Sequence, residues 1–353
     1  KKTVALCILF LFGWSSLSAQ KFSTKGTDFI MSFLPNSSTP SQLALYFSSD
    51  EASFVTITLP TGAVVTRSLS ANTADFVNLT TLMGNTIPVI PQKLESNSIT
   101  NKSIRISATK PISVYAFNTL TASTDAAIII PIATLDDEYR VFSSPNNTQY
   151  RDGSQFSIVS IATSTVVEIT PTAPILLGTP RPTGVPFTIT LHAGQVYFAQ
   201  SNGDLTGSKI RVIGSGGGSC GKVAVFSGTM RTNLPNNSAS SGFDHLYEQM
   251  MPISSWGKNF ILPFLATASK MLVRIIPANT AIPTTITTSI APGTLTIAAN
   301  ANFLELPNVT SALSLSASQP VSVAIYSMSS TFGYTAGVGD PFLMLIPPIE
   351  QRI

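Results

Sequence analysis

Charged side chains are scarce in this sequence of 353 residues: Asp, Glu, Lys and Arg make up 10% of it, and the net charge is +3. A soluble protein usually has a charged share of about 25%. Nucleic-acid binding needs clustered Lys and Arg to neutralise phosphates, so the absence of a basic run argues against that class. Because 44% of the residues are hydrophobic, a disordered chain is disfavoured as well. The surface must be polar through Ser, Thr and Asn, as in exported β-rich proteins.

Cysteine and histidine are scarce too, with two residues of each type. Cys7 lies in an apolar leading segment, which leaves Cys220 as the lone thiol of the remainder and rules out an intrachain disulfide there. A structural zinc site of the Cys-His type is excluded for the same reason, and His192 and His245 do not stand at metal-ligand spacing. Apolar burial and strand pairing must therefore hold the fold.

The first residues have the pattern of a secretory signal peptide. Lys1-Lys2 precede an apolar stretch from Val4 to Trp14, and small residues follow up to Ala19. The apolar stretch is too short to remain as a membrane-spanning helix; a buried core helix is the alternative. We therefore expect residues 1–19 to be removed and the product to be extracellular or on the outer cell surface, with no transmembrane segment and no lipid anchor.

No helical stripe longer than two turns is present after this segment, whereas short alternating runs are frequent. In Phe54–Leu59, a period of two places Val55, Ile57 and Leu59 on one face and the Thr residues on the other. Branched side chains of this kind suit a pleated, half-buried surface. Short strands separated by Pro, Gly, Asn and Ser predict an all-β protein built from sandwich-like modules.

Internal similarity predicts how these strands are organised. Three landmarks recur in the same order: a strand that ends in proline, a return strand, and a Pro-Ile pair. Their copies are Val55–Pro60, Val166–Pro171 and Leu272–Pro277; Pro111–Tyr115, Lys222–Phe226 and Pro320–Ala324; and Pro131-Ile132, Pro252-Ile253 and Pro348-Ile349.

The repeat predicts three related β units of roughly 100 residues each, which is the size of one sandwich domain. Their bounds would be 21–127, 128–251 and 252–353. No long linker separates the units, so we expect a rigid tandem array; a ring closed by pairing of the last strand with the first is the alternative. The third Pro-Ile pair stands at the end of the sequence, which suggests that further repeats follow.

Two segments invite a chemical interpretation that has a simpler alternative. The glycine-rich run 214–221 resembles a phosphate cradle, but a strand rather than a helix follows it, so a hairpin loop is favoured. Asp136-Asp137-Glu138 offers the oxygen ligands that calcium prefers. Consecutive strand residues point to opposite faces, however, so a solvated turn is favoured there and no cofactor is expected. Asp204 is interpreted as a turn residue.

The segment around His245 is unlike the rest of the chain, because it concentrates acid, amide, imidazole and aromatic side chains. The candidate residues of this structural or binding motif are Asp244, His245, Glu248, Gln249 and Trp256. A catalytic role would require Asp244 to orient His245, which adjacent residues do not readily do. We interpret the motif as a buried polar network that locks the junction between the second and third units, with ligand contact as the alternative.

With these residues in place, the chain resembles the IgGFc-binding protein N-terminal domain family. The matching pieces are Gly26–Phe29, Lys110–Tyr115, Asp204–Ser208, Val223–Gly228, Asp244–Gln249 and Ser255–Lys258. Members occur in mucus-associated animal proteins and in secreted proteins of Bacteroidetes-like bacteria, so the resemblance implies an extracellular, modular, non-catalytic protein. Phe243 stands where the family pattern often has a cysteine, and a disulfide to Cys220 is therefore not expected.

The functional expectation is a non-catalytic binding or adhesion module at the cell surface, with a glycan, a mucin or another protein as its partner. A purely structural spacer that presents a C-terminal domain is one alternative. A secreted carbohydrate-active enzyme is the other, and it would need two carboxylates facing each other about 5–10 Å apart across a cleft. The sequence identifies neither the ligand nor the oligomeric state.

Overall fold

The computed structural model describes residues 22–37, 42–83, 95–145, 153–216, 221–235, 242–334 and 339–351. These residues form 23 strands in four antiparallel sheets, with two one-turn helices, α1 (Leu79–Leu82) and α2 (Ser330–Gly333). The predicted all-β class is therefore confirmed. Within the described ranges, neither helix has the length and apolar content needed to cross a membrane.

The first lobe is one sheet of seven strands in the order β4-β3-β7-β2-β5, with β1 and β8 also paired to β7. The first half of β7 pairs with β1 and β3 and its second half with β2 and β8, so the sheet curls like a barrel. Val55 and Ile57 of β3 are fully buried while Phe54 is exposed, as the alternation predicts. The strands are β1 (Gly26–Met31), β2 (Gln42–Ser49), β3 (Ser53–Thr58), β4 (Val64–Leu69), β5 (Thr73–Asn78), β7 (Ile104–Leu120) and β8 (Ser123–Ile129).

The third lobe has the same strand order: β20-β19-β22-β18-β21, with β17 and β23 also paired to β22. Its strands are β17 (Gly257–Leu262), β18 (Met271–Pro277), β19 (Thr284–Thr288), β20 (Thr294–Ile297), β21 (Leu304–Val309), β22 (Leu313–Tyr326) and β23 (Leu343–Ile346).

The first strands of these two lobes share one local feature. Each begins with a bulge at a glycine, Gly26 in β1 and Gly257 in β17. A Cβ atom on Gly26 would stand 2.5 Å from Pro131, and one on Gly257 would stand 2.4 Å from Pro348. Only glycine leaves room for this close approach, so the same residue type solves the same packing problem in both lobes.

The middle lobe consists of two sheets, ordered β12-β11-β14-β9 and β16-β15-β10-β13-β6. In it, β14 and β15 take the positions that the two halves of β7 take in the first lobe. The strands are β6 (Ser98–Thr100), β9 (Glu138–Arg140), β10 (Ser154–Ser160), β11 (Thr165–Thr170), β12 (Phe187–Leu191), β13 (Val196–Ser201), β14 (Lys209–Gly214), β15 (Val223–Thr232) and β16 (Asp244–Gln249).

The glycine-rich run 214–221 connects β14 to β15, and the hairpin predicted for it is wrong. In the described residues, these two strands pair with different neighbours and not with each other. Residues 217–220, Cys220 among them, lie outside the described residues.

One strand in a sheet of the middle lobe stands, in sequence, among the strands of the first lobe. β6 precedes β7 in the sequence, yet it pairs with β13, with Thr100 opposite Val196. The first lobe therefore lends an edge strand to its neighbour. This exchange ties the two lobes through backbone hydrogen bonds, in addition to their side-chain contacts.

The hydrophobic core is continuous across the lobes. Phe33 and Leu45 of the first lobe belong to the same buried cluster as Phe226 and Tyr247 of the middle lobe. A second cluster joins the middle lobe to residues of the third, among them Tyr326. A third cluster lies within the third lobe alone. The lobes therefore share hydrophobic cores and are not independent domains joined by linkers.

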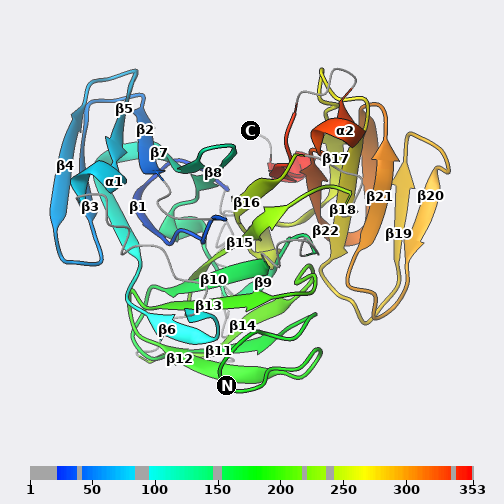
Figure 1. Ribbon diagram of the computed structural model, residues 1–353, viewed down its shortest axis with the longest axis horizontal. Helices are drawn as coiled ribbons and strands as arrows, with labels where there is room; N and C mark the ends of the chain where they lie inside the picture. Colours follow the sequence, from blue (N-terminus) through cyan, green and yellow to red (C-terminus); the bar gives the residue numbers. More distant parts are fainter. Residues whose placement is uncertain are drawn as a thin grey trace, which may run out of the picture.

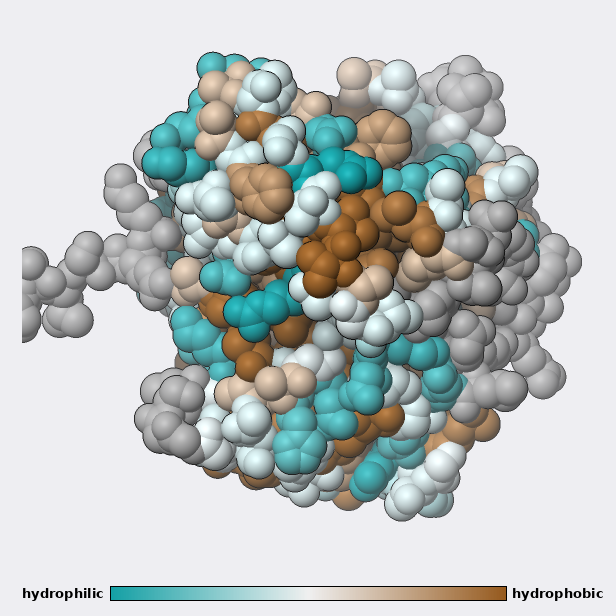
Figure 2. Space-filling model, turned by 90° about the vertical axis from the view of Figure 1, so that its left-hand side faces the viewer, coloured by the Kyte–Doolittle hydropathy of each residue, from teal (hydrophilic) through white to brown (hydrophobic). Residues whose placement is uncertain are grey.

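The three lobes gather around a common centre, and the predicted tandem array is wrong (Figure 1). β16 contacts β8 of the first lobe and β23 of the third. The ring-closing alternative is wrong too, because β23 pairs with β22 of its own lobe. Polar and hydrophobic side chains are interspersed over the face seen in Figure 2, which carries separate brown patches rather than one continuous band.

The sequence landmarks hold in part. Pro131, Pro252 and Pro348 each precede a short 3-10 turn: η2 (Ile132–Thr134), η3 (Ile253–Ser255) and η4 (Ile349–Gln351). β1 contacts η2, β9 contacts η3 and β17 contacts η4, so each turn packs against the first strand of the lobe that ends with it.

The strand landmark that ends in proline was assigned wrongly in its third copy. Val55–Pro60 and Val166–Pro171 contain β3 and β11, which take the same place in their sheets. Leu272–Pro277 belongs to β18, which pairs with β22 as β2 pairs with β7. The match was misleading because neighbouring strands of one sheet share the same hydrophobic alternation.

Candidate functional site

β16, which carries four of the five candidate residues, lies where the lobes meet, and all six of its residues are buried. It pairs with β15 along one edge and contacts β8 of the first lobe along the other. In the described part of the chain, β8 pairs only with β7. Two strands from different lobes therefore run side by side without a backbone ladder between them.

Polar side chains of β8 replace the missing ladder. Ser123 Oγ accepts a hydrogen bond from the backbone N–H of His245 at 3.1 Å. Asp125 Oδ2 accepts one from the N–H of Tyr247 at 2.8 Å. Both acceptors and both donors are two residues apart, which is the spacing of side chains on one face of a strand. A buried N–H without a hydrogen-bond partner destabilises the fold by about 1–3 kcal/mol. Ser123 and Asp125 prevent that loss for His245 and Tyr247.

Side chains of β16 in turn accept hydrogen bonds from backbone N–H groups, including one of the first lobe. Gln249 Oε1 accepts a hydrogen bond from the N–H of Ile130, just after β8, at 2.8 Å. The Asp244 carboxyl accepts a hydrogen bond from the N–H of His245 at 2.7 Å, and the backbone of Thr124 lies close enough to lower its pKa. We call this set, Ser123, Asp125, Asp244, His245, Glu248 and Gln249, the junction network. Its polar groups hold backbone in place.

The junction network reaches the third lobe through two carboxyl groups. The backbone of Leu343 lies near Asp125 and that of Leu345 lies near Glu248, and in each case its N–H lowers the pKa of the acid. Both leucines belong to β23. Burial raises the pKa of Asp125 well above its ordinary value, although its backbone donors act in the opposite direction. Burial and the neighbouring Asp125 raise the pKa of Glu248 as well. Backbone from three lobes therefore lies around one buried group of acids.

Asp244 is the member of this network whose titration falls near neutral pH. Burial raises its pKa to about 7, with a smaller increase from the nearby charge of Asp340. An acid whose pKa is higher in the folded than in the unfolded protein favours folding below its unfolded value. That contribution is lost as the pH rises toward the folded value. Asp244 therefore weakens the fold between pH 4 and pH 7.

We expect Asp244→Asn to become more stable relative to the wild type as the pH rises from 4 to 7.5, by up to about 4 kcal/mol. Asn keeps an acceptor oxygen for the N–H of His245 but cannot ionise. Urea unfolding at several pH values measures the difference between the two proteins, and this difference cancels the pH effects of all other groups. Parallel stability curves would contradict the role assigned to Asp244.

His245 is buried as a neutral ring. Its Nδ1 lies 3.0 Å from Thr229 O and donates to it, whereas Nε2 lies 3.3 Å from Asn118 Nδ2 and accepts from it. Asn118 Nδ2 also donates to Leu34 O at 2.8 Å. Burial lowers the pKa of His245 to about 4. A fully buried histidine with both nitrogens engaged cannot reach a substrate proton, so its role is to pack and to bond.

Trp256, the fifth candidate residue, lies away from the junction network. It follows η3, and its Nε1 donates to Met251 O at 3.1 Å. With Phe22 and Phe260 it lines a small apolar pocket beside the third lobe. The sequence placed the network between the second and third units. The structure places it mainly between the first and middle lobes, because β8 is the strand that lies against β16.

A polar pocket of about 510 Å³ opens where the 3-10 turns meet. Thr134, Ser254 and Gln351 line it, one from each turn, together with Asp136 and Lys222. Its polar groups already have partners within the chain: Ser254 Oγ donates to Asp136 Oδ2 at 2.5 Å. Lys222 Nζ donates to a backbone carbonyl of η2 at 3.1 Å.

The carboxylates of the acidic run Asp136-Asp137-Glu138, considered above for calcium, do not converge on one point; two of them bind different side chains. Asp136 bonds Ser254, and Glu138 forms an ion pair with Lys209 at 2.7 Å. Across the described ranges, no group of three or more His, Cys, Asp or Glu side chains is placed to hold a metal ion. The structure therefore gives the calcium alternative no support.

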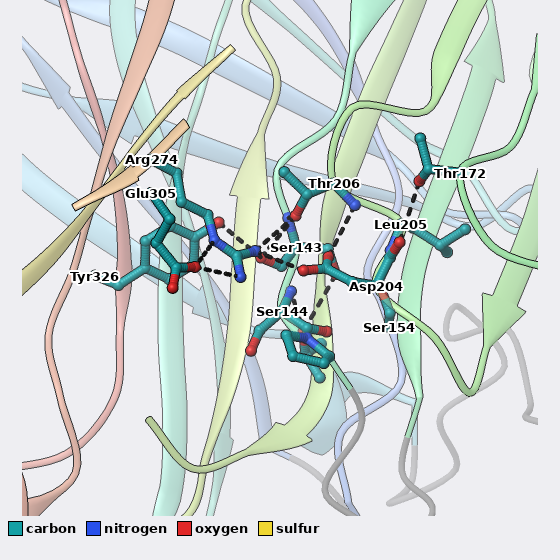
Figure 3. A network of polar contacts seen from close by, with 12 residues as sticks. Ser143, Ser144, Ser154, Thr172, Asp204, Leu205, Thr206, Arg274, Glu305 and Tyr326 are labelled. Carbon is teal, nitrogen blue, oxygen red and sulfur yellow. Dashed lines mark hydrogen bonds and ion pairs between the residues drawn. The ribbon is translucent and has the colours of Figure 1, made fainter. Parts of the chain in front are cut away.

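A second polar network joins the middle and third lobes, and it centres on Arg274 of β18 (Figure 3). Arg274 pairs with Asp204 and with Glu305, each at 2.9 Å. Its Nη1 also donates to Ser143 O and Thr206 Oγ1, each at 2.8 Å. The Arg274 side chain is 5% exposed, so a buried charge bridges two lobes and is paired with carboxylates of both.

Sequence reasoning missed this network, although a signal for it was present. Arg274 is the lone charged residue of a strand, Met271–Pro277, that is otherwise hydrophobic and proline-terminated. A cation in such a strand needs a paired anion. Asp204 was interpreted as a turn residue, and its Oδ1 does accept the N–H of Thr206 at 2.9 Å. Its other oxygen meets Arg274, which local sequence could not reveal.

Comparison with known proteins places the chain in a family. A family model described as IgGFc binding protein matches residues 125–353, and the match begins at the junction residue Asp125. The human protein named IgGFc-binding protein is 29% identical over 171 residues, which cover 48% of this chain and 3% of that protein. No solved structure matches. The family model covers well over half of the sequence, and the chain therefore belongs to the IgGFc-binding protein family.

Proposed function

We propose that this chain is a non-catalytic binding module of an exported protein, with its ligand-binding surfaces carried on a rigid three-lobed scaffold. The observation that carries the proposal is how the buried acids are used. Asp125 of β8 accepts a hydrogen bond from the backbone N–H of Tyr247 on β16, Asp244 accepts one from the N–H of His245 beside it, and Glu248 is buried among the same strands. Groups that an enzyme would direct at a substrate are here directed at the chain itself, so the chemistry of the signature segment is structural.

The scaffold is proposed to consist of three copies of one sandwich-like unit. The first and third lobes share the same order of seven strands. The middle lobe reproduces it with the long strand divided into β14 and β15. Each lobe also ends in a 3-10 turn that contacts its own first strand. A common ancestral unit accounts for all three correspondences.

Export is proposed from the sequence, because residues 1–19 lie outside the described residues. A charged start, an apolar stretch and small residues before Ala19 form the signal peptide pattern. The low share of charged residues fits an extracellular setting, in which Ser, Thr and Asn supply the polar surface. Adhesion at a cell surface or to a secreted matrix follows as the proposed role.

The ligand is to be sought among three classes: the Fc region of immunoglobulin G, mucin glycoproteins and free glycans. The name of the human relative states Fc binding for that protein. This chain covers a small part of it, so Fc is one probe among several. A structural spacer is the second candidate, favoured by the shared core that fixes the lobes relative to one another.

The test is a binding screen with the protein beginning at Gln20, immobilised on a sensor surface. Fc fragments, purified mucin and a glycan array are passed over it, and the same glycans are incubated with the protein and analysed for cleavage. We expect saturable retention of at least one probe and no cleavage. Retention of none would favour the spacer, and glycan cleavage that Glu248→Gln abolishes would establish an enzyme.

A further inference from the structure

Three large aromatic side chains form an exposed row across the first lobe. Phe76 of β5, Tyr46 of β2 and Tyr115 of β7 occupy directly opposite positions on three adjacent antiparallel strands. Their exposed fractions are 51%, 39% and 40%. Each ring leaves a large apolar area in water, and three in register form a continuous feature. We call Phe76, Tyr46 and Tyr115 the aromatic row.

The aromatic row is held rigidly from below and from the side. The opposite face of the same strands is core, with Leu45, Val77 and Val114 fully buried. The ring centroids of Tyr46 and Phe76 lie 5.2 Å apart, with 19° between the ring planes. The ring centroid of Phe117 lies 4.7 Å from that of Tyr46. A ligand that docks here would therefore meet preorganised side chains and would lose little affinity to their ordering.

The outward-facing residues around the aromatic row are polar but uncharged, and the exposed acid beside Phe76, Asp75, is already paired with Arg67 at 3.6 Å. No outward-facing residue of β5, β2, β8 or the Ser113–Thr119 part of β7 carries a charge. Hydroxyl and amide side chains stand beside the rings instead, among them Ser48, Asn78 and Gln42. A charged partner would lose its hydration here without finding a counter-charge, so the face fits a neutral ligand with hydroxyl groups.

The size of the aromatic row favours a small ligand over a protein. A Phe or Tyr side chain has about 150–250 Å² of surface, so three with exposed fractions of 39–51% present roughly 200–350 Å². A stable protein interface needs about 800 Å² on each partner. Sugar rings combine apolar C–H faces, which pack on the negative faces of aromatic rings, with hydroxyl edges that suit Ser, Asn and Tyr side chains.

From this juxtaposition of an uncharged rim and three aligned aromatic side chains, we propose that the outer face of β5-β2-β7 binds a neutral oligosaccharide. The inference rests on the proposed binding function and assigns it a site and a ligand class. The site lies in the part of the chain before residue 125, where the family match begins.

The experiment measures binding of the protein, beginning at Gln20, to an array of neutral mucin-type, β-glucan and xylan oligosaccharides. The double variant Tyr46→Thr/Phe76→Thr removes two rings and retains strand-forming side chains. Phe54→Thr is the matched control, because Phe54 is equally exposed on β3 of the same lobe. Tyr115→Thr tests the third ring separately, and circular dichroism checks that each variant is folded.

We expect the double variant and Tyr115→Thr to weaken binding of the retained oligosaccharide at least tenfold, with Phe54→Thr within twofold of the wild type. Binding that both ring variants leave unchanged would overturn the assigned site while leaving the binding function standing. Retention of a deglycosylated protein probe alone, lost in the double variant, would assign the face to a protein and overturn the ligand class. Retention of no oligosaccharide by the wild type would overturn the ligand class assigned to this face, and the binding function itself would be overturned only if the Fc and mucin probes also failed to bind.

Discussion

Replacing Arg274 by Met is expected to lower the free energy of unfolding by about 3–5 kcal/mol, the range for breaking a buried ion pair. Burial lowers the pKa of Arg274, but Asp204, Tyr326 and Glu305 raise it by more, so the charge is kept in the interior. Removing the guanidinium leaves the carboxylate of Asp204 facing the third lobe without its partner. Urea unfolding followed by far-UV circular dichroism measures the loss.

Arg211→Met is the matched control for this prediction. Arg211 pairs with Glu168 at 2.9 Å, but its side chain is 46% exposed. Surface ion pairs contribute about 0–1 kcal/mol because water screens them and long side chains must be ordered. Both substitutions remove a guanidinium, but Arg274 pairs with one acid across the lobes and one within its sheet, whereas Arg211 has a single exposed pair within a sheet. Equal losses would show that the Arg274 network does not hold the lobes together.

Gly228→Ala is expected to destabilise the fold by about 3 kcal/mol or more, at or beyond the upper end of ordinary overpacking. Gly228 of β15 stands opposite Tyr247 of β16. A Cβ atom there would lie 1.7 Å from the carbonyl oxygen of Leu246, which is backbone and cannot rotate away. β16 would have to shift from β15, and the bonds that it makes to the first lobe would shift with it.

Gly214→Ala controls for the change of residue type. A Cβ atom on Gly214 would meet Val166 at 3.6 Å, which is ordinary van der Waals contact. We expect a change of less than about 1 kcal/mol there, as for most substitutions without a named mechanism. Thermal unfolding of both variants compares them under one condition. Similar midpoints for the two would mean that β15 and β16 are not closely packed at Gly228.

Local sequence predicted the elements well and their assembly poorly. Alternation in β3 placed Val55 and Ile57 inside correctly, since the period of two is a property of the strand itself. The partners of β16 were not predictable, because Ser123 and Asp125 come from another lobe and an unpaired N–H has no signature in the sequence. The same holds for Arg274, whose strand signalled a buried cation but not which anion would meet it.

The aromatic row illustrates the same limit from the outer side of the sheet. Alternation says that Tyr46 and Leu45 face opposite sides of β2, but both are hydrophobic enough to be core. Which side is outside is decided by what packs on the sheet, and that depends on the whole lobe. Register across three strands then aligns Tyr46 with Phe76 and Tyr115, an alignment that no single segment encodes.

Differential scanning calorimetry of the protein beginning at Gln20 shows whether buried polar networks and a shared core join the three lobes into one cooperative body. We expect a single unfolding transition whose calorimetric enthalpy equals the van't Hoff enthalpy. Two or three resolved transitions, each with the enthalpy of one lobe, would contradict it.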